Sequence, residues 1–226
     1  MAARRLPFPI LFEDEDIIVI DKPAGLLTTH TKLRGRAARE TQTTAENLLN
    51  DYLRKGQLKS KKRVYLVHRL DRETSGVMMF AKSEEVAEFF RADWNNLTEK
   101  TYLARVAGIM ESDHGVFESY LREDDDGYMV RSVRNAKPSK GGKPAKKART
   151  EWRRLSTEDG TTLVEVKLHS GRKNQIRVHF SEAGHPVIGD EKYGGENASR
   201  MYLHSHSLKL KLGRYPEPFT APSSWR

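Results

Sequence analysis

Apolar runs alternate with polar segments along the 226-residue chain and predict most of its secondary structure. A short run at 17–20 predicts a buried strand that enters a Pro/Gly turn at 21–25. Apolar residues at 65–67 and 77–80 predict two more strands, separated by a charged segment at 68–76. The pattern therefore places a cluster of charges where two core strands meet.

Three helices are predicted from apolar spacing and from the residues at their ends. Thr43 and Glu46 have the spacing of a capping box, and the helix that follows them is expected to end at Gly56. Ser83 is a good N-cap for a second helix. The expected inner face of that helix consists of Val86, Phe89, Phe90, Trp94 and Leu97. A third helix is predicted within 171–184.

Further strands are predicted at 101–106, 162–168 and 201–212, the last of which ends by alternating leucine with lysine. Strands and helices mix without the regular βαβ alternation of a doubly wound fold. The chain is therefore expected to adopt an α+β fold with a largely antiparallel sheet. Its length is compatible with one compact domain or with two tightly packed halves.

The chain is basic, with 40 Lys and Arg residues against 31 Asp and Glu and a formal charge of +9. This balance favours a polyanionic partner such as nucleic acid, because phosphate binding releases condensed counterions. A basic enzyme with no such partner is the alternative. The absence of cysteine excludes disulfides, thiolate nucleophiles and cysteine-ligated metals. The first residues lack a secretory pattern, and no apolar run approaches the length of a membrane span, so we expect a cytoplasmic protein.

The segment 131–149, here called the basic arm, has eight basic residues, two glycines, two prolines and no acid. It is predicted to be a loop, either simply solvated or ordered by contact with phosphates. Four of its cations, here called the arm lysines, are expected to contact an RNA backbone. They are Lys140, Lys143, Lys146 and Lys147. At the other end of the chain, residues 1–9 are predicted to be a tail.

The charged segment HRLDRETSG at 68–76 places Asp71 between Arg69 and Arg72. A carboxylate beside guanidinium groups stays ionised, which suits a nucleophile or an electrostatic stabiliser better than a general acid. An Asp–Arg pair that only satisfies a β-turn is the alternative interpretation.

A second polar cluster occupies residues 169–195. Arg172, Gln175 and His179 fall on related turns of the predicted helix, while Arg177 projects elsewhere. Polar residues this dense beside a helix N-terminus make an anion site, whereas an exposed amphipathic helix is the alternative.

An ordered set of segments resembles the motifs of the RluA-type pseudouridine synthases. HRLDRETSG is similar to the family's catalytic motif, in which Thr-Ser-Gly follows His-Arg-Leu-Asp and two variable residues. The other matching segments are DKPAGL at 21–26, KTYLARVAG at 100–108, GRKNQIRVH at 171–179, GHPVIGD at 184–190 and LHSHSL at 203–208. One departure is Asn174, where most members have histidine; an amide does not titrate, which puts an acid–base role there in doubt.

The resemblance implies a pseudouridine-synthase-like fold, with a mainly antiparallel mixed sheet flanked by helices and a central cleft. It implies one catalytic domain over 1–226 without the S4-like domain that many relatives carry. In the implied reaction, the C1′–N1 bond of an RNA uridine breaks and the uracil is rejoined through C5. No cofactor or metal is implied, the partner is RNA, and we expect a monomer.

The resemblance also assigns roles to individual residues. Asp71 would start the chemistry, either by attacking C1′ or by removing the 2′-proton. Tyr102 would stack on the flipped uracil, and its hydroxyl could help with the C5 proton. Arg177 would pair with Asp71, and Arg69 would help displace the base and hold a phosphate.

The remaining candidates would bind the substrate. Ile176 would line the wall opposite Tyr102, and Arg172 and Gln175 belong to the same motif. His68 is included as well, although it could instead fix the loop by a hydrogen bond.

Two other classes of function are compatible with parts of the sequence. A non-catalytic RNA- or ribosome-binding module could use the same basic surface, but it would not need Asp71 or Tyr102. A histidine-metal hydrolase would use the histidines of the C-terminal half, yet no carboxylate pattern completes such a site. These histidines are His179, His185, His204 and His206.

Overall fold

The computed structural model describes residues 6–30, 42–57, 59–134, 136, 143–223 and 225. Its contacts divide the chain into two compact units. Unit 1 comprises Met1–Thr98 and Ser205–Arg226, and unit 2 comprises Glu99–His204. Unit 1 is therefore assembled from both ends of the chain, whereas unit 2 is continuous in sequence.

The sheet of unit 1 has the strand order β1-β2-β4-β10. Its strands are β1 (Ile10–Glu13), β2 (Ile17–Lys22), β4 (Ser75–Ala81) and β10 (Leu203–Leu210), with the short strands β3 (Tyr65–Leu66) and β11 (Phe219–Thr220) pairing with β4 and β10. Strands β2 and β4 are antiparallel, with Ile17 opposite Ala81 and Lys22 opposite Gly76. All seven residues of β4 are buried, because protein covers both of its faces.

Two helices of unit 1, α2 (Ala45–Arg54) and α3 (Glu84–Leu97), match two of the predicted helices. Ser83 caps α3 as predicted, since its hydroxyl accepts a hydrogen bond from Val86 N at 3.2 Å. The predicted cap of α2 was wrong by one residue. Thr44, not Thr43, accepts from Asn47 N, and the Glu46 carboxylate bonds the Thr29 hydroxyl instead of closing a capping box.

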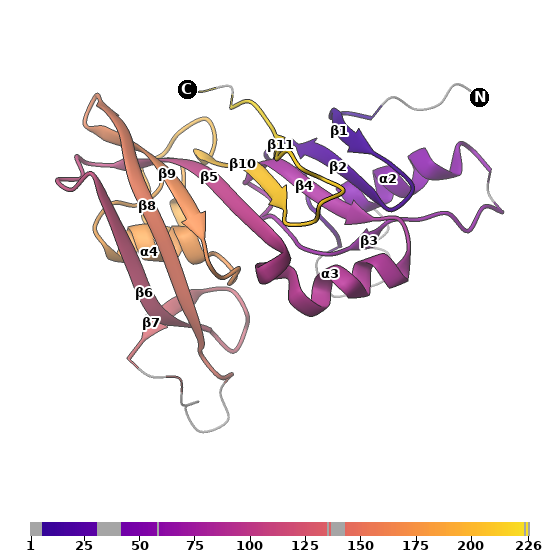
Figure 1. Cartoon of the computed structure of the whole chain (residues 1–226). Coiled ribbons are helices and arrows are strands. Elements are labelled where there is room, and N and C mark those ends of the chain that lie inside the picture. Colours follow the sequence, from indigo (N-terminus) through magenta and orange to yellow (C-terminus); the bar gives the residue numbers. More distant parts are fainter. Residues whose placement is uncertain are drawn as a thin grey trace. The chain divides into compact units, whose positions relative to one another are not determined.

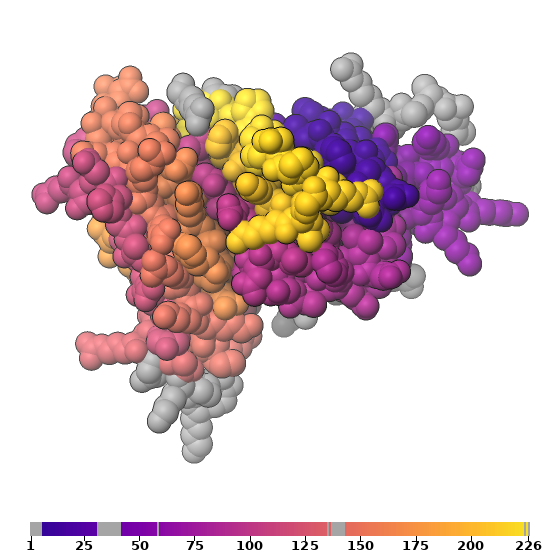
Figure 2. All heavy atoms as spheres, in the orientation of Figure 1, coloured from indigo at the N-terminus to yellow at the C-terminus, as the bar shows by residue number. Residues whose placement is uncertain are grey.

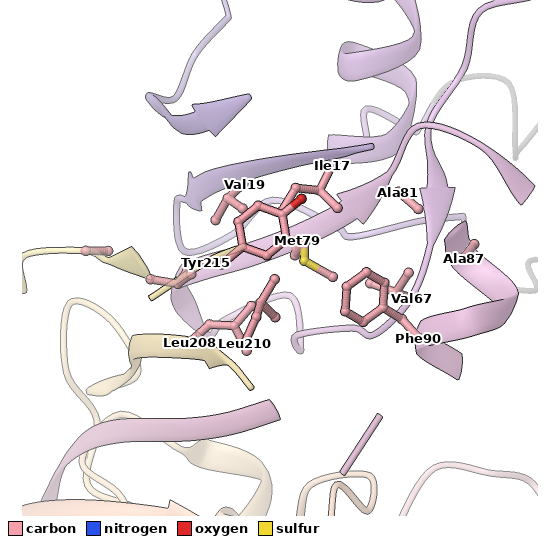
Figure 3. Close-up of a cluster of buried hydrophobic side chains, with 12 residues drawn as sticks. Ile17, Val19, Val67, Met79, Ala81, Ala87, Phe90, Leu208, Leu210 and Tyr215 are labelled. Atoms are coloured by element: carbon pink, nitrogen blue, oxygen red, sulfur yellow. The ribbon is translucent and has the colours of Figure 1, made fainter. Parts of the chain in front are cut away.

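The core of unit 1 joins the two ends of the chain (Figure 3). Ile17, Val19 and Met79 from the strands contact Leu208, Leu210 and Tyr215 from the C-terminal segment. In Figure 2 the yellow C-terminal residues lie directly against the indigo N-terminal strands.

Two details of the sequence prediction for unit 1 are corrected by burial. Phe8 is only 6% exposed and the Pro9 carbonyl accepts a hydrogen bond from Asp21 N, so this part of the predicted tail at 1–9 packs against β2. Phe89 was expected on the inner face of α3, but it is 52% exposed while Phe90 is 2% exposed. The buried stripe runs through Val86, Phe90 and Trp94, and Phe89 lies to one side of it.

Unit 2 is built on an antiparallel sheet with the order β5-β9-β8-β6-β7 (Figure 1). Its strands are β5 (Thr98–Ala107), β6 (His114–Glu123), β7 (Val130–Val133), β8 (Lys146–Glu158) and β9 (Thr161–Leu168). Helix α4 (Gln175–Glu182) packs on the sheet through Val178, and the 3-10 helix η1 (Glu191–Tyr193) follows it. The predicted antiparallel α+β architecture is thus present in both units.

The prediction that 131–149 forms one loop was wrong at both of its ends. Residues 131–133 belong to β7, and Lys146 begins β8, where Leu121 and Lys146 are paired across the ladder. Along β8, the buried residues Ala148 and Thr150 alternate with less buried ones. This period of two is that of a strand, although the basic composition of the segment favoured a loop. Lys140 lies outside the described residues.

No helix in the part of the chain that the structure describes is both long enough and apolar enough to cross a membrane.

Candidate active site

Asp71 lies in a tight loop between β3 and β4. Strand β3 pairs antiparallel with β4, with Leu66 opposite Phe80, so the chain reverses direction through residues 67–74. Thr74 N donates to the Asp71 carbonyl at 3.2 Å and closes a turn around this residue. The Asp71 side chain is half-buried, whereas Arg69 is exposed. The loop therefore presents the half-buried Asp71 carboxylate beside the sheet of unit 1.

The turn that follows β2 is bonded to this loop in both directions. Gly25 N donates to the Arg72 carbonyl at 2.8 Å, and Arg72 Nε donates to the Gly25 carbonyl at 3.1 Å. The Thr28 hydroxyl donates to the carbonyl of Leu70, next to Asp71, at 2.9 Å. Two of the recognised motifs, 21–26 and 68–76, therefore form one structure.

Lys22 holds the two segments together from inside. Its ammonium group is fully buried and donates to the carbonyl oxygens of Pro23, Leu26 and Arg72 at 3.0, 2.8 and 3.2 Å. An ammonium has three protons to donate, and burying it is costly unless each proton finds an acceptor. The side chain of Lys22 is thus a structural cation that fixes the backbone beside Asp71.

His68 also fixes the loop. Its Nε2 accepts a hydrogen bond from Met79 N at 3.0 Å, and its ring stacks on Trp94 of α3 with the ring centres 4.5 Å apart. Of the two roles considered for His68, the structure supports the positioning role. The bond to the backbone of β4 sets the direction in which the chain enters the loop.

Gly76 is required where the loop re-enters β4. Its φ is +107°, and a Cβ atom there would lie 2.2 Å from the carbonyl oxygen of Ser205 in β10. Any side chain would force the two strands apart. The glycine of the segment 68–76 is therefore explained by close backbone packing.

In unit 2, the candidates Tyr102 and Ile176 are buried, at 8% and 4% exposure. Tyr102 lies in the middle of β5 and is paired with Val166 of β9. A largely buried ring on a hydrogen-bonded strand has little freedom to move, which suits a surface on which a base could stack.

Arg177 forms a buried ion pair with Asp190, which the sequence pattern does not indicate. Its Nε and Nη2 each donate to one oxygen of the Asp190 carboxylate at 2.7 Å, and the two side chains are 7% and 0% exposed. Such a bidentate pair fixes the plane of the guanidinium. Asp190 also accepts from Tyr193 N and caps η1, so its own position is fixed. Asp190 lies in the matching segment GHPVIGD, but its partner could not be inferred from spacing.

The structure gives Gln175 a structural role, and its predicted contact with substrate remains a prediction. Its Oε1 accepts from the Ser170 hydroxyl and from Arg172 N, at 2.8 and 3.0 Å. Its Nε2 donates to the Arg149 carbonyl and to the Thr150 hydroxyl, at 3.0 and 2.9 Å. These four bonds use the full capacity of the amide. Gln175 therefore ties the start of α4 to β8.

His179 continues the same network into the core. Its Nδ1 lies 2.8 Å from the Thr150 hydroxyl and its Nε2 lies 3.0 Å from the Ser119 hydroxyl. Because Thr150 accepts from Gln175, its own proton is available to Nδ1, which favours the tautomer protonated at Nε2. Burial lowers the pKa of His179 below its ordinary value, although the charge of Glu182 opposes this shift. His179 is therefore a neutral core histidine.

Asn174 and Arg172 shape the approach to α4. Asn174 precedes the helix with a left-handed φ of +54°, a conformation that asparagine tolerates better than most residues. Arg172 Nε donates to the Lys147 carbonyl at 3.1 Å, which anchors its side chain on β8. The helix they introduce is buried over Gln175–Phe180, so the alternative of an exposed amphipathic helix was wrong.

Two of the arm lysines, Lys143 and Lys147, have acidic neighbours. Lys143 Nζ lies 3.3 Å from Glu123, and Lys147 Nζ lies 3.6 Å from Glu118, both on β6. An RNA phosphate would therefore compete with these carboxylates.

The histidines of the C-terminal half do not assemble into a metal site. His185 Nδ1 bonds the Ala107 carbonyl at 2.8 Å, and His206 Nδ1 bonds the Ala221 carbonyl at 3.1 Å. Within the described ranges, no three His, Asp or Glu side chains are placed to hold a metal ion.

The candidates thus fall into two groups. His68, Arg69 and Asp71 share the loop of unit 1, while Tyr102 and the residues around α4 belong to unit 2. The expected pairing of Asp71 with Arg177 remains a prediction.

Comparison with known proteins gives a consistent result. The family model described as RNA pseudouridylate synthase matches residues 16–182. The chain is 34% identical over 208 residues to the dual-specificity RNA pseudouridine synthase RluA of Vibrio parahaemolyticus, a match that covers 89% of this chain and 76% of that protein. It is 31% identical over 217 residues to the ribosomal large subunit pseudouridine synthase D of Borreliella burgdorferi, which covers 92% of this chain.

The chain is shorter than some of these relatives. It spans 63% of the Borreliella protein and 58% of an RNA pseudouridine synthase of Aquifex aeolicus that is 34% identical to it. Among solved structures, human RNA pseudouridylate synthase domain containing 4 matches with a TM-score of 0.73 and 25% identity, covering 94% of this chain and 87% of that one. The resemblance and the fold class predicted from the sequence are confirmed.

Proposed function

Because the chain belongs to the RNA pseudouridylate synthase family, we propose that it isomerises uridine to pseudouridine within a structured RNA, ribosomal or transfer. The observation that supports this most strongly is the arrangement around Asp71. A half-buried carboxylate lies in a loop that is braced by Lys22, Thr28 and His68. A simple RNA-binding surface does not require a carboxylate to be held so firmly, and a carboxylate repels phosphates.

The reaction needs an ionised carboxylate at a fixed position beside the ribose. Asp71 would either attack C1′ or remove the 2′-proton, and either step gains from a backbone that does not reorganise. Arg177, oriented by Asp190, would pair with Asp71 and hold its carboxylate in position. Arg69, which is exposed, would reach the RNA to help displace the base and hold a phosphate.

Tyr102 would provide the surface on which the flipped uracil stacks, a contact that contributes ~1–3 kcal/mol. Ile176 would complete the apolar wall around the base. None of these roles uses a cofactor or a metal ion. We further propose that the enzyme acts as a monomer in the cytoplasm, where its RNA substrates are made and folded.

The decisive experiment compares Asp71→Asn with Glu73→Gln. Both variants remove one carboxylate from the same loop, but Glu73 is exposed and has no proposed role. Purified protein is incubated with ribosomal and transfer RNA from cells that lack the gene, and pseudouridines are mapped by chemical modification and primer extension. We expect Asp71→Asn to lose all activity with RNA affinity within a few fold, and Glu73→Gln to retain both.

Modification at wild-type rates by Asp71→Asn would refute the catalytic role of this residue. Wild-type protein that binds these RNAs but modifies none of them would instead support a non-catalytic RNA-binding module.

A further inference from the structure

Unit 1 carries an apolar hollow that none of the proposed catalytic residues line. It has a volume of about 270 Å³ and lies between α3 and the C-terminal segment. Val86, Phe89 and Phe90 form one side, and Leu212 and Tyr215 form the other. The floor is the core of unit 1, to which Phe90 and Tyr215 belong (Figure 3). We call this hollow the α3 groove.

Phe89 makes the α3 groove unusual. It is 52% exposed at the groove wall and packs edge-on against Phe90, with the ring centres 5.3 Å apart. A large aromatic side chain at the edge of an apolar hollow is the arrangement that anchors protein partners, because one inserted side chain loses most of its water contact. The hollow is too small for a drug-sized ligand and has room for about one large apolar side chain.

The rim of the groove is acidic, in contrast to the basic chain as a whole. Asp16, Glu85 and Arg214 line it directly. Asp14, Glu15 and Asp16 all lie against the Arg214 guanidinium, and α3, which forms the other side, carries Glu84, Glu85 and Glu88 near its start.

The cations in this region are already engaged. Arg214 bonds Asp14 and Asp16, Arg91 bonds Glu84 at 2.6 Å, and Lys82 bonds Glu13 at 2.8 Å. The remaining negative charge would repel RNA and anionic lipid alike. A bound metal ion does not explain the carboxylates either, because no three of them among the described residues are placed to hold one.

We propose that the α3 groove is a docking site for a basic protein segment that inserts one large apolar side chain between Phe89 and Tyr215. Lysine and arginine residues on either side of that anchor would meet the carboxylates of the rim. Complementary charge of this kind raises the association rate and selects the partner, while the buried anchor supplies most of the affinity. The partner would bind without covering the proposed catalytic residues of unit 1.

The test uses three synthetic peptides and the full-length protein, with affinity measured by fluorescence anisotropy. The first peptide has lysines and arginines flanking a central leucine–phenylalanine pair. The second replaces that pair with serines, and the third replaces the basic residues with glutamates. We expect the first to bind at least about tenfold more tightly than the other two.

Two variants of the groove and one matched control locate the binding. Phe89→Ala should weaken binding of the first peptide by about tenfold, because the inserted side chain loses its contact with one wall of the groove. The double variant Glu85→Lys with Glu88→Lys should weaken binding of this peptide by a similar factor at low salt and by a much smaller factor at high salt. Tyr128→Ala is the control, because Tyr128 is a 64% exposed aromatic beside the acidic run at 124–126 of unit 2 but lines no part of this groove. It should change the affinity by less than about twofold.

Pseudouridine formation should be unchanged in all three variants, which also shows that they are folded. Equal binding of the three peptides would overturn the proposal, as would an effect of Tyr128→Ala equal to that of Phe89→Ala. If sedimentation showed wild-type dimers that Phe89→Ala dissociates, the occupant would be a second copy of this chain, and the proposed partner would be wrong.

Discussion

Replacing Asp190 with asparagine removes the charge of a buried ion pair while changing the shape of the side chain very little. In the wild type, the Asp190 carboxylate accepts from both Nε and Nη2 of Arg177 at 2.7 Å. An asparagine keeps one acceptor oxygen, but its NH2 group faces a guanidinium that has only donors. The variant therefore loses one bond outright and brings two donors together.

The expected cost follows from the burial of the pair. Its side chains are 7% and 0% exposed, and breaking a buried pair from one side typically costs about 3–5 kcal/mol. We expect Asp190→Asn to lie near the lower end, at about 3 kcal/mol, because the retained carbonyl can still accept from Nε or from Tyr193 N. A matched control is Asp124→Asn, whose partner Arg131 is exposed and 4.0 Å away. That change should cost less than about 1 kcal/mol.

Activity should fall together with stability. If Asp190 orients the guanidinium that Asp71 needs, a misplacement of about 1 Å could cost roughly 100-fold in kcat. KM should change far less than kcat, because the residue is not proposed to touch the RNA.

Denaturant unfolding and single-turnover kinetics measure the two effects. The double variant Arg177→Met with Asp190→Asn contains neither charge. Its loss in free energy of unfolding should therefore be about 1–3 kcal/mol smaller than the sum of the losses in the two single variants. It should nevertheless remain inactive. If Asp190→Asn were no less stable than Asp124→Asn, our account of the pair would be wrong. Normal kcat in Asp190→Asn would refute the positioning role.

Three further predictions follow from the site and its surroundings. Tyr102→Phe should retain most activity and Tyr102→Ala should lose it; if Phe were as inactive as Ala while RNA still bound, the hydroxyl would have a chemical role. Replacing the four arm lysines with serine should lower the slope of log K against log salt by roughly two units, with the rate at saturating RNA unchanged; an unchanged slope would show the arm to be solvated surface. Burial lowers the pKa of His179, so as the pH falls below 6.5 the unfolded chain takes up a proton before the native one does, and stability is lost. From about pH 7.5 to about pH 5.5 the free energy of unfolding should therefore fall by up to about 1.4 kcal/mol more in the wild type than in His179→Gln; equal slopes would contradict this.

Local patterns predicted the elements well where the pattern and the environment agreed. The apolar runs on either side of Asp71 became β3 and β4, and Ser83 caps its helix as expected. Composition misled where it conflicted with periodicity. The basic arm was predicted to be a loop from its charge, yet the alternating burial of Ala148 and Thr150 places its end in a strand.

The parts of the site that could not be predicted depend on contacts between distant residues. Lys22 and the Arg72 carbonyl are 50 residues apart, and no spacing rule connects an ammonium to that oxygen. The motif match identified Gln175 as a site residue, but only the four bonds of its amide show that it ties α4 to β8. Resemblance thus locates important residues, and geometry is needed to decide what each one does.

The discontinuity of unit 1 has a consequence for how the protein is made. Strand β4 leads out of the Asp71 loop and pairs with β10. The part of β10 that belongs to unit 1 begins at Ser205. On the ribosome, β4 therefore emerges long before this partner, and Glu99–His204 must be synthesised in between. At ordinary translation rates of ~5–20 residues per second, the delay is on the order of 5–20 s. During that time the apolar β4 presents an incomplete edge to solvent, the kind of surface that chaperones recognise and that aggregates most readily.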